Sequence, residues 1–537
     1  MERLSPQESV EKVLAEYLEL GKNFENPPKV TLEIISQTPP EKANVNIRDI
    51  ATTTAVQCYA AGTAQMKPRP EENFQRIADS TLEAGHLTTR QHTNFTFQLV
   101  GVSRSSTHDI LHSYPFYNSE QQSQRYVEAK AGNYLIPANL SENQRNFFIN
   151  CANFANQKYF DLLKSLHSEV EKKVQKMYPE PSFKVEKTRK RLEGKTDKLC
   201  QEIARYVLPI GQLTTIYHTL SELDLIRLFQ ASQLPNFSAE ARYLIGEMVS
   251  KVAKVDPSIL AELRPPQKIE DEEFDEFHGR FLSRVFDLKL KGKNSRLVSL
   301  DKNASQVLAD SVRNITASDL SNDQLLDLLL NPAKNPLLSS VYEVGMMDPK
   351  TQSLREISLT FATKLSHTAD SQRQRQRRTP AATPPVEAIY FGKPDYITPL
   401  VIRQNDKLKA KYDETMEIIY SSVKIAIEEG IPKKDALLLL PNAQAIRLYE
   451  TGDFFDWLHR FKQRLCFVAQ EEIFFISTDQ VEQILEVLPQ AKGTLLAPCG
   501  IRKATQISPK CPEGERFCGQ PVFNFADIKD YKKARLI

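Results

Sequence analysis

Apolar and polar positions divide the chain into segments of different periodicity. Most of residues 46–260 carries apolar residues at helical spacing, but in residues 92–102 (HTNFTFQLVGV) aromatic and β-branched residues alternate with polar ones. A period of two predicts a half-buried β-strand, whereas a period near 3.6 predicts amphipathic helices. Residues 164–198 are rich in Lys and Glu at helical spacing, which predicts a solvated helical insertion.

The clearest break in this pattern lies at residues 262–276 (ELRPPQKIEDEEFDE), where a proline pair precedes an acidic run typical of a linker. On either side, Pro209 and Pro441 begin similar helical stretches that stay 232 residues apart (441 − 209) as far as Glu240 and Glu472. A constant offset indicates a divergent tandem duplication. The predicted divisions are an N-terminal arm at 1–45, a first repeat at 46–261, a linker at 262–300 and a second repeat at 301–537.

Composition narrows the class of protein. With 41% hydrophobic and 26% charged residues and a mean hydropathy of −0.42, the chain has ordinary globular usage, which excludes disorder throughout. A formal net charge of +2 argues against a dedicated nucleic-acid binder, and the GxGxxG and GxxxxGK[ST] phosphate loops are absent. The first residues lack a signal-peptide core, and no apolar run could span a bilayer. We therefore expect a cytoplasmic protein without a membrane anchor.

Four of the seven cysteines lie in the final segment of the chain, at Cys466, Cys499, Cys511 and Cys518. Their spacing fits no standard zinc-ribbon pattern. Four thiols can nevertheless make a tetrahedral structural zinc site, and reduced, partly buried thiols are the alternative.

A set of ordered motifs resembles one family. The first repeat contains Phe95-Thr96-Phe97, Gly101 to Arg104 followed by His108, then Gln121 to Tyr126 (QQSQRY), and Glu202 to Pro209 (EIARYVLP). The second repeat contains Leu440-Pro441 and Arg464 to Ile473 (RLCFVAQEEI). These segments resemble the flavin-dependent thymidylate synthases, including their ExARxxLP helix and their closing RxxxxAQxEI element.

The resemblance implies an α+β fold in which helices pack on a mainly antiparallel sheet. It also implies an FAD-dependent enzyme that methylates dUMP to dTMP, with methylenetetrahydrofolate as carbon donor and NADPH as reductant of the flavin. Because the family's members are homotetramers with sites between subunits, two tandem repeats imply a homodimer of chains.

The two repeats depart from the family in opposite ways. In the first repeat the hallmark RHR after His108 reads His112-Ser113-Tyr114, and Ser232 replaces the late arginine. In the second repeat Leu437 replaces the arginine of the LP helix, but Arg464 is present and Arg373-Gln374-Arg375 follows His367. The repeats have thus kept complementary halves, which predicts one composite site per chain and a reciprocal site that is inactive.

The resemblance assigns roles to particular side chains. Arg464 would stabilise the anionic form of uracil, Ser123, Arg125 and Gln121 would hold the nucleotide, and Arg205 would contribute to the same site. His92, Arg373 and Arg375 would contact the flavin or a phosphate. Arginine suits such positions because its guanidinium stays charged and pairs bidentately with phosphate.

Structural explanations compete with these roles. Arg464 could pair with Glu471 or Glu472, Arg205 could pair with Glu202, and His92 could be an ordinary residue at a strand start. The run SQRQRQRR at 371–378 could be a basic loop that binds nucleic acid. Two other functions therefore stay open: an enzyme of the same fold acting on another pyrimidine nucleotide, and a catalytically silent scaffold that binds nucleotide or nucleic acid.

Overall fold

The computed structural model describes residues 5–35, 44–58, 60–68, 71–113, 117–178, 182, 185–269 and 274–537. The principal elements of the first half are α1 (Pro6–Glu19), β1 (Lys29–Ile35), α2 (Ile47–Gln57), α3 (Glu71–Glu83), η3 (Leu87–Gln91), β2 (Asn94–Ser103), α4 (Arg104–Ser113), β3 (Asn118–Gln121), α5 (Glu142–Met177), α7 (Glu186–Ala204), η4 (Arg205–Val207), β4 (Leu213–Ser221), α8 (Glu222–Ala231), α9 (Ala239–Val255) and α10 (Ile259–Glu262).

The second half repeats this order with different insertions. Its principal elements are α11 (Glu276–Leu290), β5 (Ser295–Leu300), α12 (Ala304–Thr316), α13 (Asn322–Leu330), α14 (Pro349–Gln352), β6 (Ser358–Ser366), α15 (His367–Arg373), β7 (Ala381–Ala382), α16 (Leu400–Arg403), α17 (Asp406–Glu428), α18 (Lys433–Ala436), η9 (Leu437–Leu439), β8 (Ala445–Asp453), α19 (Phe454–Arg464), α20 (Glu471–Val487), α21 (Pro498–Ala504) and α22 (Ile528–Ala534).

The described strands form two four-stranded antiparallel sheets of matching topology. Their orders are β1-β2-β4-β3 and β5-β6-β8-β7, so each strand of the first sheet has a counterpart in the second. The strand predicted at 92–102 is β2, in which Phe95, Phe97 and Leu99 are buried and alternate with more exposed residues. The predicted α+β class and the tandem duplication are both confirmed.

Both predicted connecting segments contain parts of the sheets. The segment predicted as an arm at 1–45 includes β1, which pairs with β2 from Lys29 to Ile35. The segment predicted as a linker at 262–300 includes α11 and β5, and β5 pairs with β6 from Ser295 to Leu300. Each repeat therefore begins one edge strand earlier than predicted, because a short strand with mixed polarity gives little periodic signal before it has a partner.

The two repeats meet about a local pseudo-twofold axis. Pro209 and Pro441 form an antiparallel bridge, and their neighbours exchange backbone hydrogen bonds in symmetric pairs. Ile210 N–H donates to Leu440 O, and Asn442 N–H donates to Leu208 O, both at 2.8 Å. The 232-residue offset seen in the sequence thus marks residues that face each other at the junction.

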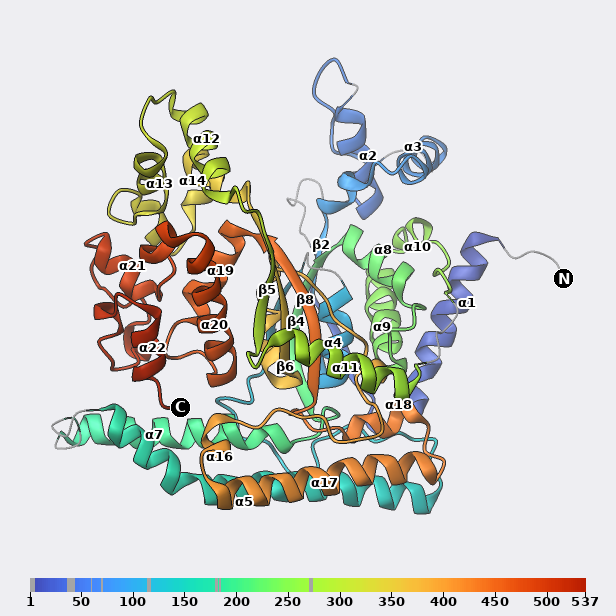
Figure 1. Ribbon diagram of the computed structural model, residues 1–537. Coiled ribbons are helices and arrows are strands. Elements are labelled where there is room, and N and C mark those ends of the chain that lie inside the picture. Colours follow the sequence, from blue (N-terminus) through green and yellow to red (C-terminus); the bar gives the residue numbers. More distant parts are fainter. Residues whose placement is uncertain are drawn as a thin grey trace.

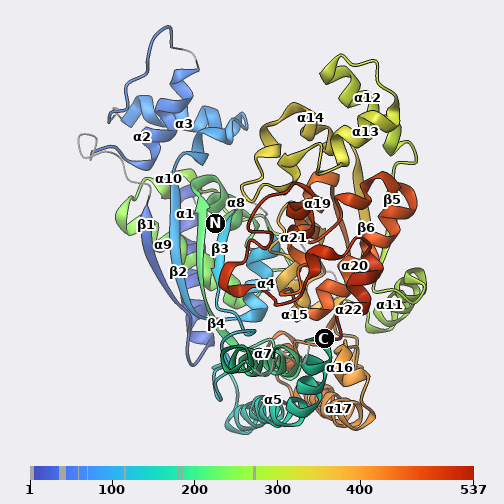
Figure 2. The ribbon, with the colours of Figure 1, turned by 90° about the vertical axis from the view of Figure 1, so that its left-hand side faces the viewer.

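A shared hydrophobic core lies at this junction. It joins buried residues of α5, α7 and residues 206–210 to those of α17 and residues 436–443. Helices α5, α7 and α17 lie along one end of the molecule beneath both halves, while α2, α3, α12 and α13 project at the opposite end (Figures 1 and 2). The predicted helical insertion at 164–198 corresponds to the second half of α5 and most of α7; residues 179–181, 183 and 184 lie outside the described residues. Among the helices of the described residues, none combines the length and apolar character needed to cross a membrane.

Acid stability should depend on His218, which is buried in β4 beside the Tyr117 ring. Burial lowers the pKa of His218 to about 4. Because the unfolded state keeps the ordinary value near 6.5, it binds more protons between these pH values, and stability falls as the pH drops from about 6.5 to about 4. We expect a loss of as much as about 3 kcal/mol from this residue.

Urea midpoints measured at neutral pH and near pH 4.5 test this expectation. The His218→Phe variant should lose less stability on acidification than the unmodified chain. Equal pH dependence of the two proteins would show that His218 does not contribute.

Candidate nucleotide site between the repeats

The registers of the two sheets determine which residues are equivalent. Ser103 pairs with Leu213 and Ser366 pairs with Ala445, and these partners are 232 residues apart (445 − 213). The backbone N–H of Ser103 donates to Glu240 Oε1 at 2.8 Å, and that of Ser366 donates to Glu472 Oε1 at 2.7 Å. Ser103 and Ser366 therefore occupy the same position in the two repeats.

A β-bulge in the first repeat, without a counterpart in the second, changes the offset between equivalent residues of the two repeats. The pairing of β2 with β4 shifts between Val100 and Val102, where Gly101 has φ 77°, and β6 pairs with β8 without a shift. A left-handed φ at a bulge favours glycine because it has no Cβ. Beyond the bulge the offset between the repeats is 263 residues (366 − 103).

This register corrects the alignment of the hallmark segment. His367 is the counterpart of Arg104 and not of His108, because Arg104 N–H donates to Gln212 O and His367 N–H donates to Gln444 O. The counterpart of the residue triplet 112–114 is therefore 375–377, which reads Arg-Gln-Arg. The hallmark of the second repeat therefore lies two residues beyond the triplet 373–375 inferred from the sequence. In the first repeat, residues 114–116 lie outside the described residues.

Five arginines from both repeats gather where α4, η4 and α19 approach one another, and we call them the arginine cluster: Arg104, Arg125, Arg205, Arg375 and Arg464. Burial, together with the nearby charges of Arg205 and Arg375, lowers the pKa of Arg104 to about 9. Burial likewise lowers the pKa of Arg464 to about 9, with contributions from Arg460, Arg375 and Arg125. The structure thus brings together four of the predicted arginines, two from each repeat, and adds Arg104.

The cluster has more positive charge than its protein partners neutralise. Buried guanidinium nitrogens of Arg104, Arg205 and Arg464 have no hydrogen-bond partner among the described residues. Arg375 is exposed, and no described residue pairs with it. An uncompensated buried cation is costly, so this arrangement favours an anionic ligand.

Of the fixed contacts of the cluster, the one between Arg125 and Val468 crosses between the repeats and the others lie within one repeat. Arg464 Nη2 donates to Gln372 O at 2.6 Å, which holds α19 against α15. Arg125 pairs with Glu202 and donates from Nη2 to Val468 O at 2.5 Å. Burial opposes the charge of Arg125, but Glu202 raises the pKa of Arg125 above its ordinary value. Of the competing pairs considered above, Arg464 makes no ion pair with Glu471 or Glu472, and Glu202 instead pairs with Arg125.

Ser123 lies beside a cavity of about 280 Å³ whose lining also includes Arg104, Gln122, Lys130 and Asn133. Ser123 Oγ accepts a hydrogen bond from Arg125 N–H at 3.2 Å. The cavity is close to the lower end of the range for ligand pockets, roughly 300–1,000 Å³. Gln121 instead turns toward α4, where its Nε2 donates to Thr107 Oγ1 at 3.2 Å.

Two of the predicted flavin residues are placed elsewhere. Arg373 is buried and donates from Nε to Asp370 Oδ1 at 2.6 Å and from Nη2 to Thr383 Oγ1 at 3.2 Å. His92 is exposed at the end of η3, and none of its described contacts joins it to the arginine cluster. The roles of His92 and Arg373 in flavin binding stay predictions.

The basic run at 371–378 is largely occupied by contacts within the chain. Besides Arg373, Arg377 lies 5.1 Å from the Tyr117 ring centroid and donates to Asn118, and Arg378 pairs with Glu343 at 2.8 Å. Arg375 alone in this run is left open among the described residues. The run therefore does not form a basic loop that presents all of its charges to a nucleic acid.

The pseudo-twofold axis relates the arginine cluster to a second position, which we call the reciprocal position. None of the five arginines has an arginine as its counterpart there. The residues equivalent to Arg104, Arg125, Arg205, Arg375 and Arg464 are His367, Glu387, Leu437, His112 and Ser232. The ion pair of Arg125 with Glu202 is replaced by one of opposite polarity, in which Lys434 lies 3.5 Å from Glu387.

A cavity of about 60 Å³ with several acidic groups in its lining lies at the position reciprocal to the arginine cluster. Its lining includes Asp109, Glu240, Glu387 and Asp435. Burial raises the pKa of Asp109 to about 8 and that of Glu240 to about 7. In place of the arginines of the cluster, this cavity presents carboxyl groups and a single lysine, Lys434, which is paired with Glu387.

The four C-terminal cysteines approach one another near α21 and the chain end without forming a compact ligand set. Burial raises the pKa of Cys466 and of Cys499 to about 12, and the neighbouring thiols add to both shifts. Among the described residues, no three of these thiols have sulfur atoms within 4.8 Å of one another. The zinc site at these cysteines stays a prediction.

Sequence reasoning missed two members of the site. Arg104 belongs to the GVSR segment that carries the resemblance. The equivalent residue of the second repeat is His367, so a comparison of the repeats did not point to an arginine at this position. Gln372 contacts Arg464 through its backbone carbonyl and lies one helical turn before Arg375. No signal in the sequence marks this contact, because it is made by a backbone carbonyl.

Comparisons with known proteins agree with the duplicated fold. The family model described as thymidylate synthase complementing protein matches residues 35–258 and again 296–490. A flavin-dependent thymidylate synthase from Clostridium tetani is 30% identical over 236 residues, which cover 43% of this chain and 85% of that protein. One from Nitratidesulfovibrio vulgaris is 26% identical over 212 residues, covering 38% of this chain and 77% of that protein.

A solved structure of a UMP/dUMP methylase PolB from Streptomyces cacaoi, bound with 5-Br dUMP, is 15% identical to this chain, with a TM-score of 0.31. It matches over 44% of this chain and 95% of its own length. The evidence for identity therefore comes from the sequence matches, which cover both halves of the chain in turn. The chain belongs to the thymidylate synthase complementing protein family, to which it is related through flavin-dependent thymidylate synthases, and it carries two copies of the family's domain in tandem.

Proposed function

We propose that the chain is a flavin-dependent thymidylate synthase that converts dUMP to dTMP at one composite site, with methylenetetrahydrofolate as carbon donor and NADPH as reductant. The observation that carries the proposal is the arginine cluster, in which both repeats contribute buried guanidinium groups without sufficient counter-charge. Family membership supports the reaction, because the relatives that match are named for it.

The nucleotide phosphate supplies the missing charge. A dianionic phosphate can accept several charge-assisted hydrogen bonds, and guanidinium groups present paired donors to it. We assign Arg104, Arg125, Arg205 and Ser123 to this side of the nucleotide, because Arg104 and Ser123 line the 280 Å³ cavity on the first repeat and the charges of Arg125 and Arg205 lie next to Arg104 in the cluster. Lys130 adds a further cation at the cavity wall.

The pyrimidine ring requires a different kind of assistance. Negative charge develops on uracil when its C5 attacks the one-carbon unit, and a buried guanidinium aimed at the ring edge stabilises that charge. Arg464 suits this role because α19 and the Gln372 carbonyl fix it while its Nε has no partner. Its pKa of about 9 keeps the side chain charged at neutral pH.

FAD requires cations near its pyrophosphate, and the second repeat offers them. Arg375 has no partner among the described residues, and Arg377 lies over Tyr117 close by. We propose that Arg375 and Arg377 hold anionic groups of FAD, with His92 as a further contact. When bound, FAD supplies the hydride that reduces the transferred carbon. The chain's own residues bind and orient the nucleotide.

One site per chain follows from the loss of every reciprocal arginine. Isothermal titration of the purified chain with dUMP should give a stoichiometry of one, and the absorbance of bound flavin should correspond to one FAD per chain. Two nucleotides per chain would contradict the composite site. Binding of flavin without formation of dTMP would instead favour another pyrimidine substrate, and a chain that bound neither ligand would favour the silent scaffold.

A matched pair of variants separates the two positions. Arg125→Gln should raise the Kd for dUMP by about 10- to 100-fold, because a hydrogen bond to a charged group is worth roughly 1.5–3 kcal/mol. Glu387→Gln changes the equivalent residue of the reciprocal position and should leave the Kd unchanged. If both substitutions weakened binding equally, the two positions would not differ in function.

Assembly follows from the same relationship. Because members of the family that carry one domain per chain form homotetramers, we propose that two tandem chains form a homodimer with four domains. Sedimentation equilibrium measures this directly, and a monomer that forms dTMP would contradict it.

A further inference from the structure

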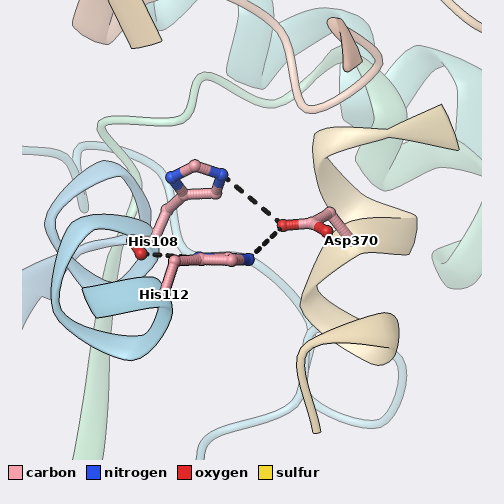
Figure 3. A group of neighbouring side chains, drawn as sticks. All are labelled: His108, His112 and Asp370. Atoms are coloured by element: carbon pink, nitrogen blue, oxygen red, sulfur yellow. Dashed lines mark hydrogen bonds and ion pairs between the residues drawn. The ribbon is translucent and has the colours of Figure 1, made fainter. Parts of the chain in front are cut away.

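A second cluster lies at the junction, distinct from the arginine cluster. His108 and His112 project from α4 of the first repeat toward Asp370 on α15 of the second (Figure 3). His108 Nε2 lies 3.5 Å and His112 Nε2 lies 2.8 Å from Asp370 Oδ2. One ligand atom from each residue falls in a group whose members are all within 4.8 Å of one another, and no other such group occurs among the described residues.

We propose that His108, His112 and Asp370 bind a divalent transition-metal ion, best matched by Zn²⁺, that links the two repeats. Histidines four residues apart on a helix present both imidazoles on one face, which is a common geometry for zinc ligands. Two imidazole nitrogens and a carboxylate oxygen form a ligand set that Zn²⁺ accepts, with water in a fourth position.

The ligand atoms are free to coordinate an ion. His108 Nε2, His112 Nε2 and Asp370 Oδ2 are buried, and their ion pairs with one another are the only polar contacts of these three atoms among the described residues. Buried polar atoms usually have partners, and three that converge with no partner outside their own group offer a ready position for a shared ion. A shared metal ion would satisfy all three.

Neighbouring groups already orient these ligands. His112 Nδ1 lies 2.6 Å from His108 O, which favours the tautomer that has its proton on Nδ1 and leaves Nε2 with a lone pair. Asp370 Oδ1 accepts from Arg373 Nε at 2.6 Å, which leaves Oδ2 to face the histidines. Such contacts behind the ligands are typical of metal centres.

The site can exist only once in the chain. The counterparts of His108, His112 and Asp370 are Ser371, Arg375 and Thr107, which cannot form an equivalent set. An ion held by α4 and α15 would stabilise their contact, because it binds the folded junction and not the unfolded chain.

Metal content of the full chain tests the proposal. After incubation with Zn²⁺ and gel filtration, elemental analysis should give about one ion per chain for this ligand set. His112→Gln and Asp370→Asn should each reduce this to background, and Zn²⁺ should raise the Tm of the unmodified chain but not of His112→Gln. The double variant Cys499→Ser, Cys518→Ser controls for the C-terminal thiols and should keep its ion.

A second measurement needs no substitution. Co²⁺ bound to the unmodified chain should give visible ligand-field absorption without the intense thiolate charge-transfer band that sulfur ligands produce. An unmodified chain that retains no ion would overturn the proposal, as would an ion lost in the cysteine variant or a Co²⁺ spectrum with thiolate bands. The readouts do not involve dUMP or FAD, so failure here and failure of the proposed function are separate results.

Discussion

Replacing Arg464 by Ala should reduce the rate of dTMP formation by about 10²–10³-fold, the loss seen when one preorganised donor is removed from a charge-stabilising site. The guanidinium is buried, is held by the Gln372 carbonyl at 2.6 Å, and lies beside Arg125 and Arg375 of the arginine cluster. The substitution removes stabilisation of the charged pyrimidine, so kcat should fall more than the affinity for dUMP. Steady-state kinetics with reduced flavin measure both quantities.

Two further variants make this expectation specific. Arg464→Lys keeps a charge but not the planar donor pair, and it should recover only part of the rate. Arg313→Ala removes an arginine of α12 whose described partners are Asp310 and Asn322, and its rate should match that of the unmodified chain. An Arg464→Ala enzyme with normal kcat would rule out the role assigned to this residue.

Leu208→Ala and Leu440→Ala should each destabilise the whole chain by about 2–5 kcal/mol, the usual cost of truncating a buried leucine. Both side chains are fully buried in the core that joins the repeats, and their backbone carbonyls accept the symmetric hydrogen bonds of the junction. Because that core belongs to both halves, a substitution in one half should lower the stability of the other.

The single tryptophan allows this coupling to be measured. Trp457 is buried in α19 of the second repeat, so its fluorescence reports on that half. Leu208→Ala changes the first repeat, yet it should shift the urea midpoint of tryptophan fluorescence as much as that of circular dichroism. A shift confined to circular dichroism would mean that the halves unfold independently. Leu288→Ala, at a position 77% exposed, should change the midpoint little.

Sequence patterns predicted the repeats better than their boundaries. The β2 strand was visible in the sequence because its buried and exposed residues alternate. The 232-residue offset was visible because Pro209 and Pro441 stand at equivalent places in the two repeats. β1 and β5 were missed because an edge strand acquires its identity only from the strand it pairs with. The hallmark triplet was placed two residues too early because the sequence alone aligned His367 with His108, whereas the strand pairing aligns His367 with Arg104.

The amino-acid sequence by itself determined the family, the duplication and the complementary loss of arginines between the repeats, because these depend on which residue types occur in which order. Only the tertiary structure decided that Arg104 and Gln372 join the site, that Arg373 is bound to Asp370, and that the reciprocal cavity is acidic. Those outcomes depend on charges that are distant in sequence and meet only when the two repeats pack together. The physical reason is that the cost of a buried charge is set by its neighbours in space.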